Sequence, residues 1–197
     1  MTNKKAVVFD LDDTLINFCE TFCRWMQKTH QLPEENPLYD EYDLMAPFHA
    51  NLKDPDTIFW LRKFEEAGAV DDVNRTPLID IFESYANSPD HRVIIMTARG
   101  WMKEPEDSVY RLMDRFGIPR YKYEVLITKH GESKAAMYAR TIDNELECVY
   151  DDVIANLETF HARYPKAKLY CPARPWNVSS AKHIQRISIG NLFSSQQ

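Results

Sequence analysis

One stretch near the N-terminus, residues 7–15, constrains the fold more than any other part of the sequence. It reads VVFDLDDTL, a short apolar run followed by acidic and hydroxyl residues. The apolar run, residues 7–9, favours a strand that is buried on both faces, as in a parallel sheet. Because side chains alternate along a strand, Asp10 and Asp12 point the same way at its carboxyl end. The stretch therefore predicts a buried strand that delivers two carboxylates where α/β folds usually bind ligands.

The spacing of this acidic pair suits a particular chemistry. One carboxylate can attack an electrophile and form a covalent ester, and the second can protonate the leaving group and then activate water. Two such close acids repel each other, so a divalent cation normally joins them. A bare Asp-x-Asp is also explained by an ordinary acidic turn, so the flanks decide. With the apolar run before it and Thr14 and Leu15 after it, the stretch resembles the Asp-x-Asp-x-Thr nucleophile motif of the haloacid dehalogenase-like (HAD) phosphatase superfamily.

Strand-like and helix-like segments alternate along the rest of the chain, which predicts a parallel, doubly wound sheet. The expected strands are centred on residues 7–9, 92–97, 124–127, 147–150 and 168–171. Together with the resemblance, this pattern predicts an α/β fold of the HAD-like Rossmannoid type. It would be a three-layer sandwich with a five-stranded parallel sheet and an inserted helical cap.

The inserted cap is inferred from one long interval. Asp10 and Thr97 are 87 residues apart, far more than one crossover between parallel strands needs. The surplus, residues 17–75, is mostly helical in pattern and resembles a type 1 cap. We therefore expect a core of residues 1–16 and 76–197 with the cap between them; the alternative is that these helices simply cover the sheet.

Polar residues follow each of the first four predicted strands, and a fold of this kind brings such positions into one crevice. They are Asp10 and Asp12 after the first strand, Thr97 after the second, Lys134 in the helix after the third, and Asp151 and Asp152 after the fourth. Each of them taken alone is also explained by helix capping or by a solvated surface position. Lys129, in the loop before the helix, is an alternative to Lys134 for the same role. Their joint order resembles the four motifs of HAD phosphatases.

The resemblance implies a role for each position. Asp10 would carry an aspartyl-phosphate, Asp12 would be the acid and base, Thr97 would donate to a phosphoryl oxygen, and Lys134 would offset the charge of the phosphate. The presence of Asp12 favours phosphate esters over halides, because a leaving-group oxygen needs a proton.

The implied cofactor is Mg²⁺. Its predicted ligands are the carboxylates and one backbone carbonyl of Asp10, Asp12, Asp151 and Asp152. Such an oxygen-rich set suits a hard cation.

Two narrower resemblances concern the substrate. The cap length, Phe18, the pair Phe59 and Trp60, and the loop 174–177 (Arg-Pro-Trp-Asn) resemble the 5′(3′)-deoxyribonucleotidase family, which implies cap aromatics that stack on a base. Plain packing inside the cap is the alternative for these rings. The segment 97–99 (Thr-Ala-Arg) instead resembles the 3′-phosphatase domain of polynucleotide kinases. The predicted substrate contacts are Thr14, Phe18, Trp60, Ala98 and Arg99.

The composition limits the classes of substrate and binding partner that we expect. A formal net charge of −6 argues against a protein that coats nucleic acid or an anionic membrane. We expect a small-molecule phosphate substrate, with a nucleic-acid end as the second choice and no membrane partner, and we leave the oligomeric state open. Four cysteines without a Cys-x-x-Cys pair, and no apolar run of ~20 residues or signal peptide, predict a cytoplasmic location. A HAD-like binding module without turnover is the alternative from a different class.

Overall fold

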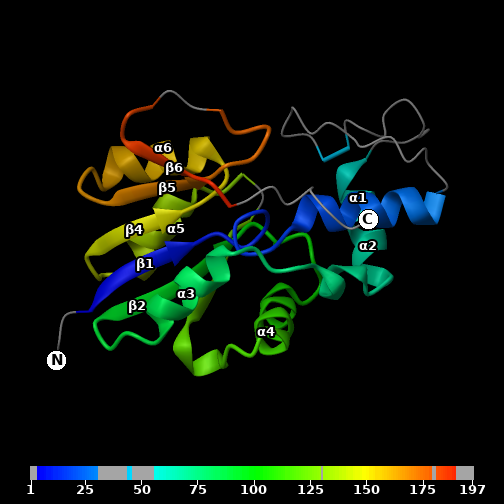
Figure 1. Cartoon of the computed structure of the whole chain (residues 1–197), viewed down its shortest axis with the longest axis horizontal. Helices are drawn as coiled ribbons and strands as arrows, with labels where there is room; N and C mark the ends of the chain where they lie inside the picture. Colours follow the sequence, from blue (N-terminus) through cyan, green and yellow to red (C-terminus); the bar gives the residue numbers. More distant parts are fainter. Residues whose placement is uncertain (1–3, 31–43, 46–55, 130, 179–180, 190–197) are drawn as a thin grey trace.

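The structure is a computed structural model, and it describes residues 4–30, 44–45, 56–129, 131–178 and 181–189. Its centre is a six-stranded parallel sheet with the order β3-β2-β1-β4-β5-β6 (Figure 1). The strands are β1 (Lys5–Phe9), β2 (His91–Thr97), β3 (Glu124–Ile127), β4 (Leu146–Tyr150), β5 (Lys168–Pro172) and β6 (Ile184–Ile187). The chain reverses its direction of progress across the sheet between β1 and β4, so a crevice is expected at their carboxyl ends.

Helices cover both faces of this sheet. The α-helices are α1 (Phe18–His30), α2 (Thr57–Glu66), α3 (Leu78–Ala86), α4 (Pro105–Arg115), α5 (Lys134–Thr141) and α6 (Ile154–Arg163), with short 3-10 helices η2 (Ala69–Asp72) and η3 (Arg120–Lys122). Apolar residues of α3 and α4 share one core cluster with one face of β1 and β2, and those of α5 and α6 share a second cluster with the other face. The described part of the chain contains no helix that is both long and apolar enough to cross a membrane.

Strand β1 is buried from both sides, as its apolar sequence predicts. Val7 and Phe9 belong to one core cluster, whereas Ala6 and Val8 belong to the other. The ring of Phe9 is stacked on that of Tyr150, with centroids 4.4 Å apart. The strand that ends in the acidic stretch is therefore anchored in the core on both of its faces.

The sequence predicts five strands, and this number is wrong because β6 adds a sixth. Strand β6 pairs in parallel with β5 alone and lies at the edge of the sheet. Its two middle residues, Gln185 and Arg186, are exposed, so the strand carries little of the apolar signal on which the prediction depended. An edge strand needs only one paired side, which is why so polar a segment can form it.

Helices α1 and α2 lie side by side at one end of the sheet, between β1 and β2 in the chain (Figure 1). Aromatic rings pack between them. The ring centroid of Phe64 in α2 lies 5.4 Å from that of Phe22 and 5.7 Å from that of Phe18, both in α1. Residues 31–43 and 46–55 of the predicted cap lie outside the described residues. The division into a core and a cap of residues 17–75 therefore stays a prediction.

The first prediction tests the core that supports β1. Phe82 of α3 is fully buried, and its ring lies 5.2 Å from Phe9 and 5.8 Å from Tyr123. Replacing it in Phe82→Ala should lower the free energy of unfolding by about 3–5 kcal/mol, as measured by urea denaturation. The neighbouring Ile81 is 36% exposed, so Ile81→Ala should cost only on the order of 0.5 kcal/mol. Equal losses in both variants would contradict the assigned packing.

Candidate active site

A tight turn follows β1 and holds the acidic stretch at the end of the strand. The backbone nitrogen of Asp10 donates to Tyr150 O of β4 at 2.8 Å, so the pairing of the sheet extends to the first acid. The nitrogens of Leu15 and Ile16 both donate back to Leu11 O, at 2.9 and 3.1 Å. Asp13 adopts a left-handed conformation with φ 58°, which aspartate tolerates better than most residues. Asp12 therefore sits between an anchored strand end and a closed turn.

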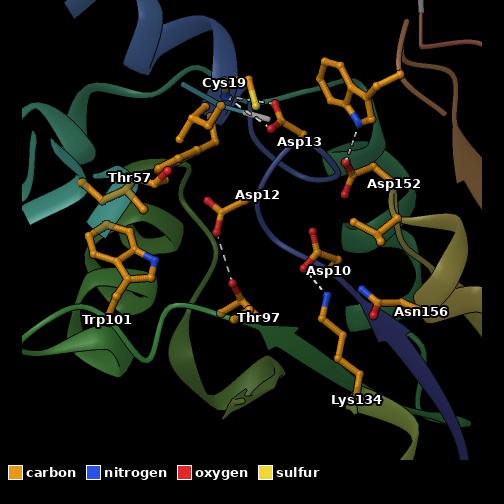
Figure 2. Close-up of a pocket in the computed structure, with 16 residues that line it drawn as sticks. Asp10, Asp12, Asp13, Cys19, Thr57, Thr97, Trp101, Lys134, Asp152 and Asn156 are labelled. Carbon is orange, nitrogen blue, oxygen red and sulfur yellow. Dashed lines mark hydrogen bonds and ion pairs between the residues drawn. The ribbon is translucent and has the colours of Figure 1, made fainter. Parts of the chain in front are cut away.

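A cavity of about 330 Å³ opens at this edge of the sheet. Five of the residues predicted for catalysis or metal binding line it, namely Asp10, Asp12, Thr97, Lys134 and Asp152. Figure 2 shows their side chains arranged around the same hollow, although they come from four separate segments of the chain. The structure thus brings together residues up to 142 positions apart in the numbering, as their order along the chain predicted.

Lys134 is the buried cation of this cavity. Its Nζ forms ion pairs with Asp10 Oδ1 and with Asp151 Oδ2, the second at 2.7 Å. It is the first residue of α5, and Ser133 before it caps the helix by accepting from Ala136 N at 3.4 Å. Lys129, the competing lysine, is exposed and does not line the cavity.

Repulsion and burial govern the protonation of these acids. Desolvation raises the pKa of Asp10 from 3.8 to about 8; the charges of Asp151 and Asp12 add to this rise, and Lys134 opposes it. Desolvation, followed by the charges of Asp10, Asp13 and Asp151, likewise raises the pKa of Asp152. Burial alone would lower the pKa of Lys134, but attraction by Asp10 and Asp151 outweighs it and the pKa rises. One lysine therefore does not neutralise the negative charge of the cluster.

Asp12 is held by a second buried cation. Arg99 Nη2 donates to Asp12 Oδ1 at 2.6 Å, Arg99 Nε lies 3.0 Å from Oδ2, and Thr97 Oγ1 donates to Oδ2 at 3.2 Å. The other side of the guanidinium donates to Ser108 Oγ of α4 at 3.0 Å. The sequence predicts Arg99 as a substrate contact, but the structure places it behind Asp12, fully buried and off the cavity wall. The Asp12 side chain itself keeps 26% of its surface exposed.

The other predicted substrate contacts divide into two groups. Phe18 and Ala98 line the cavity. Thr14 and Trp60 do not: Thr14 is fully buried and its Oγ1 accepts from Asp152 N at 3.1 Å, and Trp60 packs against the core cluster that α1 and α2 share with one face of the sheet. The proposed stacking of Trp60 on a base has no support from this placement, and plain apolar packing accounts for it.

Several lining residues were missed by the sequence analysis. They are Asp13, Cys19, Leu44, Thr57, Leu61, Trp101, Val153, Asn156 and Trp176. Asn156 lies one helical turn after Asp152, so helical spacing could have identified it. Its Nδ2 donates to both carboxylate oxygens of Asp151 at 3.1 Å. Trp101 and the cap residues carried no local signal, because only the folding of the chain brings them to the cavity.

The residues present fit the predicted Mg²⁺ in a modified form. Within the described ranges, no three His, Cys, Asp or Glu side chains converge on a metal position. Magnesium usually takes one or two protein carboxylates and keeps several waters, so Asp10 and Asp152 would suffice, with the backbone carbonyl of Asp12 as the further ligand that the resemblance implies. Asp10 and Asp152 line the cavity, and their mutual repulsion would be relieved by a divalent cation. The Asp151 oxygens, in contrast, already accept from Lys134 and Asn156.

Comparisons with known proteins identify the class of fold. No family model matches the chain, and no curated protein sequence matches it. Solved structures do match, among them a haloacid dehalogenase-like family hydrolase from Streptococcus pneumoniae (TM-score 0.56, 16% identity, 88% of this chain and 86% of that chain). The protein therefore has the HAD-like fold.

Two further similar structures contain a bound species. One is CbbY from Rhodobacter sphaeroides in complex with phosphate (TM-score 0.57, 18% identity, 93% of this chain and 92% of that chain). The other is the HAD-hydrolase YfnB from Bacillus subtilis bound to magnesium (TM-score 0.54, 12% identity, 86% of this chain and 88% of that chain). Identities this low show a shared fold and leave the activity of this chain to its own site. The narrower resemblance to 5′(3′)-deoxyribonucleotidases stays a prediction.

The second prediction follows from the pKa of Asp10, which burial raises from its ordinary value of 3.8 to about 8 in the folded protein. Between these values the folded state binds more protons than the unfolded state, so the contribution of Asp10 to stability falls as the pH rises. Asp10→Asn cannot titrate at this position. In EDTA, the free energy of unfolding of wild type relative to Asp10→Asn should therefore be lower at about pH 9 than at about pH 5. The exposed Asp143→Asn serves as control, and a gap that does not change with pH would contradict the prediction.

Proposed function

We propose that the protein is a Mg²⁺-dependent phosphomonoester hydrolase that acts through an aspartyl-phosphate on Asp10. The observation that carries this proposal is the buried ion pair of Lys134 with Asp10 and Asp151, at a cavity that Asp12 and Thr97 also line. A carboxylate beside a buried cation, at the carboxyl ends of parallel strands, is placed to meet a phosphate. The HAD-like fold supports the same class of enzyme.

The proposed reaction has two steps. In the first, an Asp10 carboxylate oxygen attacks phosphorus, the bond from phosphorus to the leaving oxygen breaks, and Asp12 gives that oxygen a proton. In the second, Asp12 takes a proton from water, and the water oxygen attacks the phosphorus of the aspartyl-phosphate. The bond from phosphorus to Asp10 then breaks, which releases inorganic phosphate and restores the Asp10 carboxylate and the protonated Asp12.

Charge explains why the other residues are needed. Two like charges 4 Å apart repel by about 4 kcal/mol at an effective dielectric of 20, so a carboxylate does not approach a phosphate dianion unaided. Lys134, whose raised pKa keeps it protonated, offsets part of this repulsion. The Thr97 hydroxyl lines the cavity beside Asp12 and would donate to a phosphoryl oxygen. Phosphoryl transfer depends mainly on such positioning and neutralisation.

The residues that would hold Mg²⁺ are Asp10, Asp152 and the backbone carbonyl of Asp12. When bound, the ion would supply the remaining positive charge opposite the phosphoryl oxygens. Asp151 is better assigned to holding Lys134, with Asn156 fixing its orientation. Phosphate bound to CbbY and magnesium bound to YfnB support a site for both species in a fold of this kind.

The cavity favours a small substrate. Its described walls include the apolar side chains of Phe18, Leu61, Trp101 and Trp176, and Lys134 is the one cation among the described lining residues. One phosphate can therefore pair with Lys134, whereas a second anionic group would lie against carboxylates and apolar side chains. We propose a small phosphomonoester with an uncharged, flat remainder, such as a nucleoside or deoxynucleoside monophosphate. The net charge of −6 supports a metabolite over a polymer end.

The third prediction tests the covalent mechanism. Asp10→Asn should lower kcat for p-nitrophenyl phosphate by about 1,000-fold or more, because no nucleophile remains. Asp12→Asn should lower kcat for a nucleoside monophosphate by at least about 100-fold, because the leaving oxygen goes unprotonated. Asp143→Asn, whose side chain is fully exposed, is the matched control with normal turnover. Retention of more than a few per cent of activity by Asp10→Asn would rule out the aspartyl-phosphate, and an inactive wild type would favour a binding module.

The fourth prediction concerns the substrate. We expect kcat/KM to be higher for members of a nucleoside monophosphate panel than for a 3′-phosphorylated oligonucleotide, with little dependence on salt. Binding along a polymer backbone would release counterions and give a steep salt dependence. Steady-state phosphate release at low and high salt makes the comparison. A clear preference for the oligonucleotide would instead favour a 3′-end phosphatase of the polynucleotide-kinase type.

A further inference from the structure

The turn between β5 and β6, residues 174–177, takes no part in the proposed reaction, although Trp176 lines the cavity. It is closed from both sides: Asn177 N donates to Arg174 O at 3.4 Å, and Arg174 N donates to Asn177 Oδ1 at 2.9 Å. The side chains of Arg174 and Asn177 are both buried. So much hydrogen bonding within four residues gives a rigid unit beside the cavity.

Arg174 reaches from this turn to the loop after β1. Its Nε and Nη2 donate to Asp13 O at 2.9 and 2.6 Å, and Nη2 also donates to Asn17 Oδ1 at 3.1 Å. Asp13 has φ 58°, a left-handed conformation that a residue other than glycine keeps only where its surroundings hold it. The guanidinium thus holds the peptide between Asp13 and Thr14, one residue beyond Asp12.

Asn177 and Trp176 reach the loop after β4. Asn177 Nδ2 donates to Asp152 O at 2.9 Å and to Pro172 O at 2.7 Å. Trp176 Nε1 donates to Asp152 Oδ2 at 3.2 Å, the interaction drawn as a dashed line at Asp152 in Figure 2. The same turn therefore holds both the backbone and the carboxylate of Asp152.

The type of donor at Asp152 matters. An indole N–H donates one hydrogen bond and carries no charge, so Trp176 fixes one carboxylate oxygen and leaves the negative charge of Asp152 in place. A lysine or arginine at this position would compete with a metal ion for that charge. Asp151 shows the contrast, because one of its oxygens accepts from the ammonium of Lys134.

We propose that the 174–177 turn positions the metal site, with Trp176 orienting the Asp152 carboxylate and with Arg174 and Asn177 holding the loops of Asp13 and Asp152. The inference rests on the proposed function, because it takes Asp152 as a Mg²⁺ ligand. Trp176, Arg174 and Asn177 are positioning residues, since they act through Asp152 and the peptide that follows Asp13. Partners that orient metal ligands in this way typically change metal affinity by about 10–100-fold.

The experiment measures Mg²⁺ binding itself, by calorimetric titration of the full-length, metal-free protein. Trp176→Phe keeps an aromatic wall and removes the N–H donor, so the Kd for Mg²⁺ should rise about 10-fold or more, with a Tm in EDTA close to wild type. Trp101→Phe is the matched control, because Trp101 lines the same cavity and none of the hydrogen bonds described above joins it to Asp152. Its Kd for Mg²⁺ should equal that of wild type.

A second variant keeps the test decisive if Trp176→Phe fails to fold. Arg174→Lys retains the charge and loses the fork of two donors on Asp13 O, so its Kd for Mg²⁺ should also rise. A wild type that binds no Mg²⁺ would overturn the proposed function as well. A wild type that binds Mg²⁺, together with folded variants that bind it equally well, would overturn the positioning role alone.

Discussion

The interaction on which the site depends is the buried ion pair of Lys134 with Asp10 and Asp151. Carboxylates crowded in a low-dielectric crevice repel each other strongly, and their burial is stable only beside a buried positive charge. Two further buried cations share this task at the margins of the cluster. Arg99 holds the carboxylate of Asp12, and Arg174 holds the carbonyl of Asp13. Three buried cations therefore surround the acidic site, and they come from the segments that follow β2, β3 and β5.

The position of β1 makes this arrangement possible. As a central strand with both faces buried, it carries Asp10 to an edge of the sheet where the ends of β2 and β4 are its immediate neighbours. Thr97 and Asp152 arrive from those neighbours, and the helix after β3 adds Lys134. Parallel strands bring their carboxyl ends to one edge, so the geometry of the sheet, and not the local sequence, collects these side chains.

The cavity has a charged part and an apolar part, and the two suit different parts of the proposed substrate. The acids and Lys134 lie where the strands end, whereas Phe18, Leu61 and Trp101 form much of the described wall. The strand-end groups suit the phosphate that every substrate of this class shares. The apolar wall suits the part that differs between substrates, and it includes residues from α1 and α2 that are absent from the motifs.

Local pattern by itself determined β1, the direction of Asp10 and Asp12, the alternation of strands and helices, and the order of Thr97, Lys134 and the acidic pair. These features follow from periodicities of two and 3.6 residues, which need no knowledge of distant contacts. Only the tertiary structure decided that Arg99 pairs with Asp12, that the turn 174–177 reaches the loops of Asp13 and Asp152, and that a polar segment forms β6. Arg174 and Asp13 are 161 residues apart. No local pattern encodes such a contact, because its partner is chosen by the packing of the whole sheet.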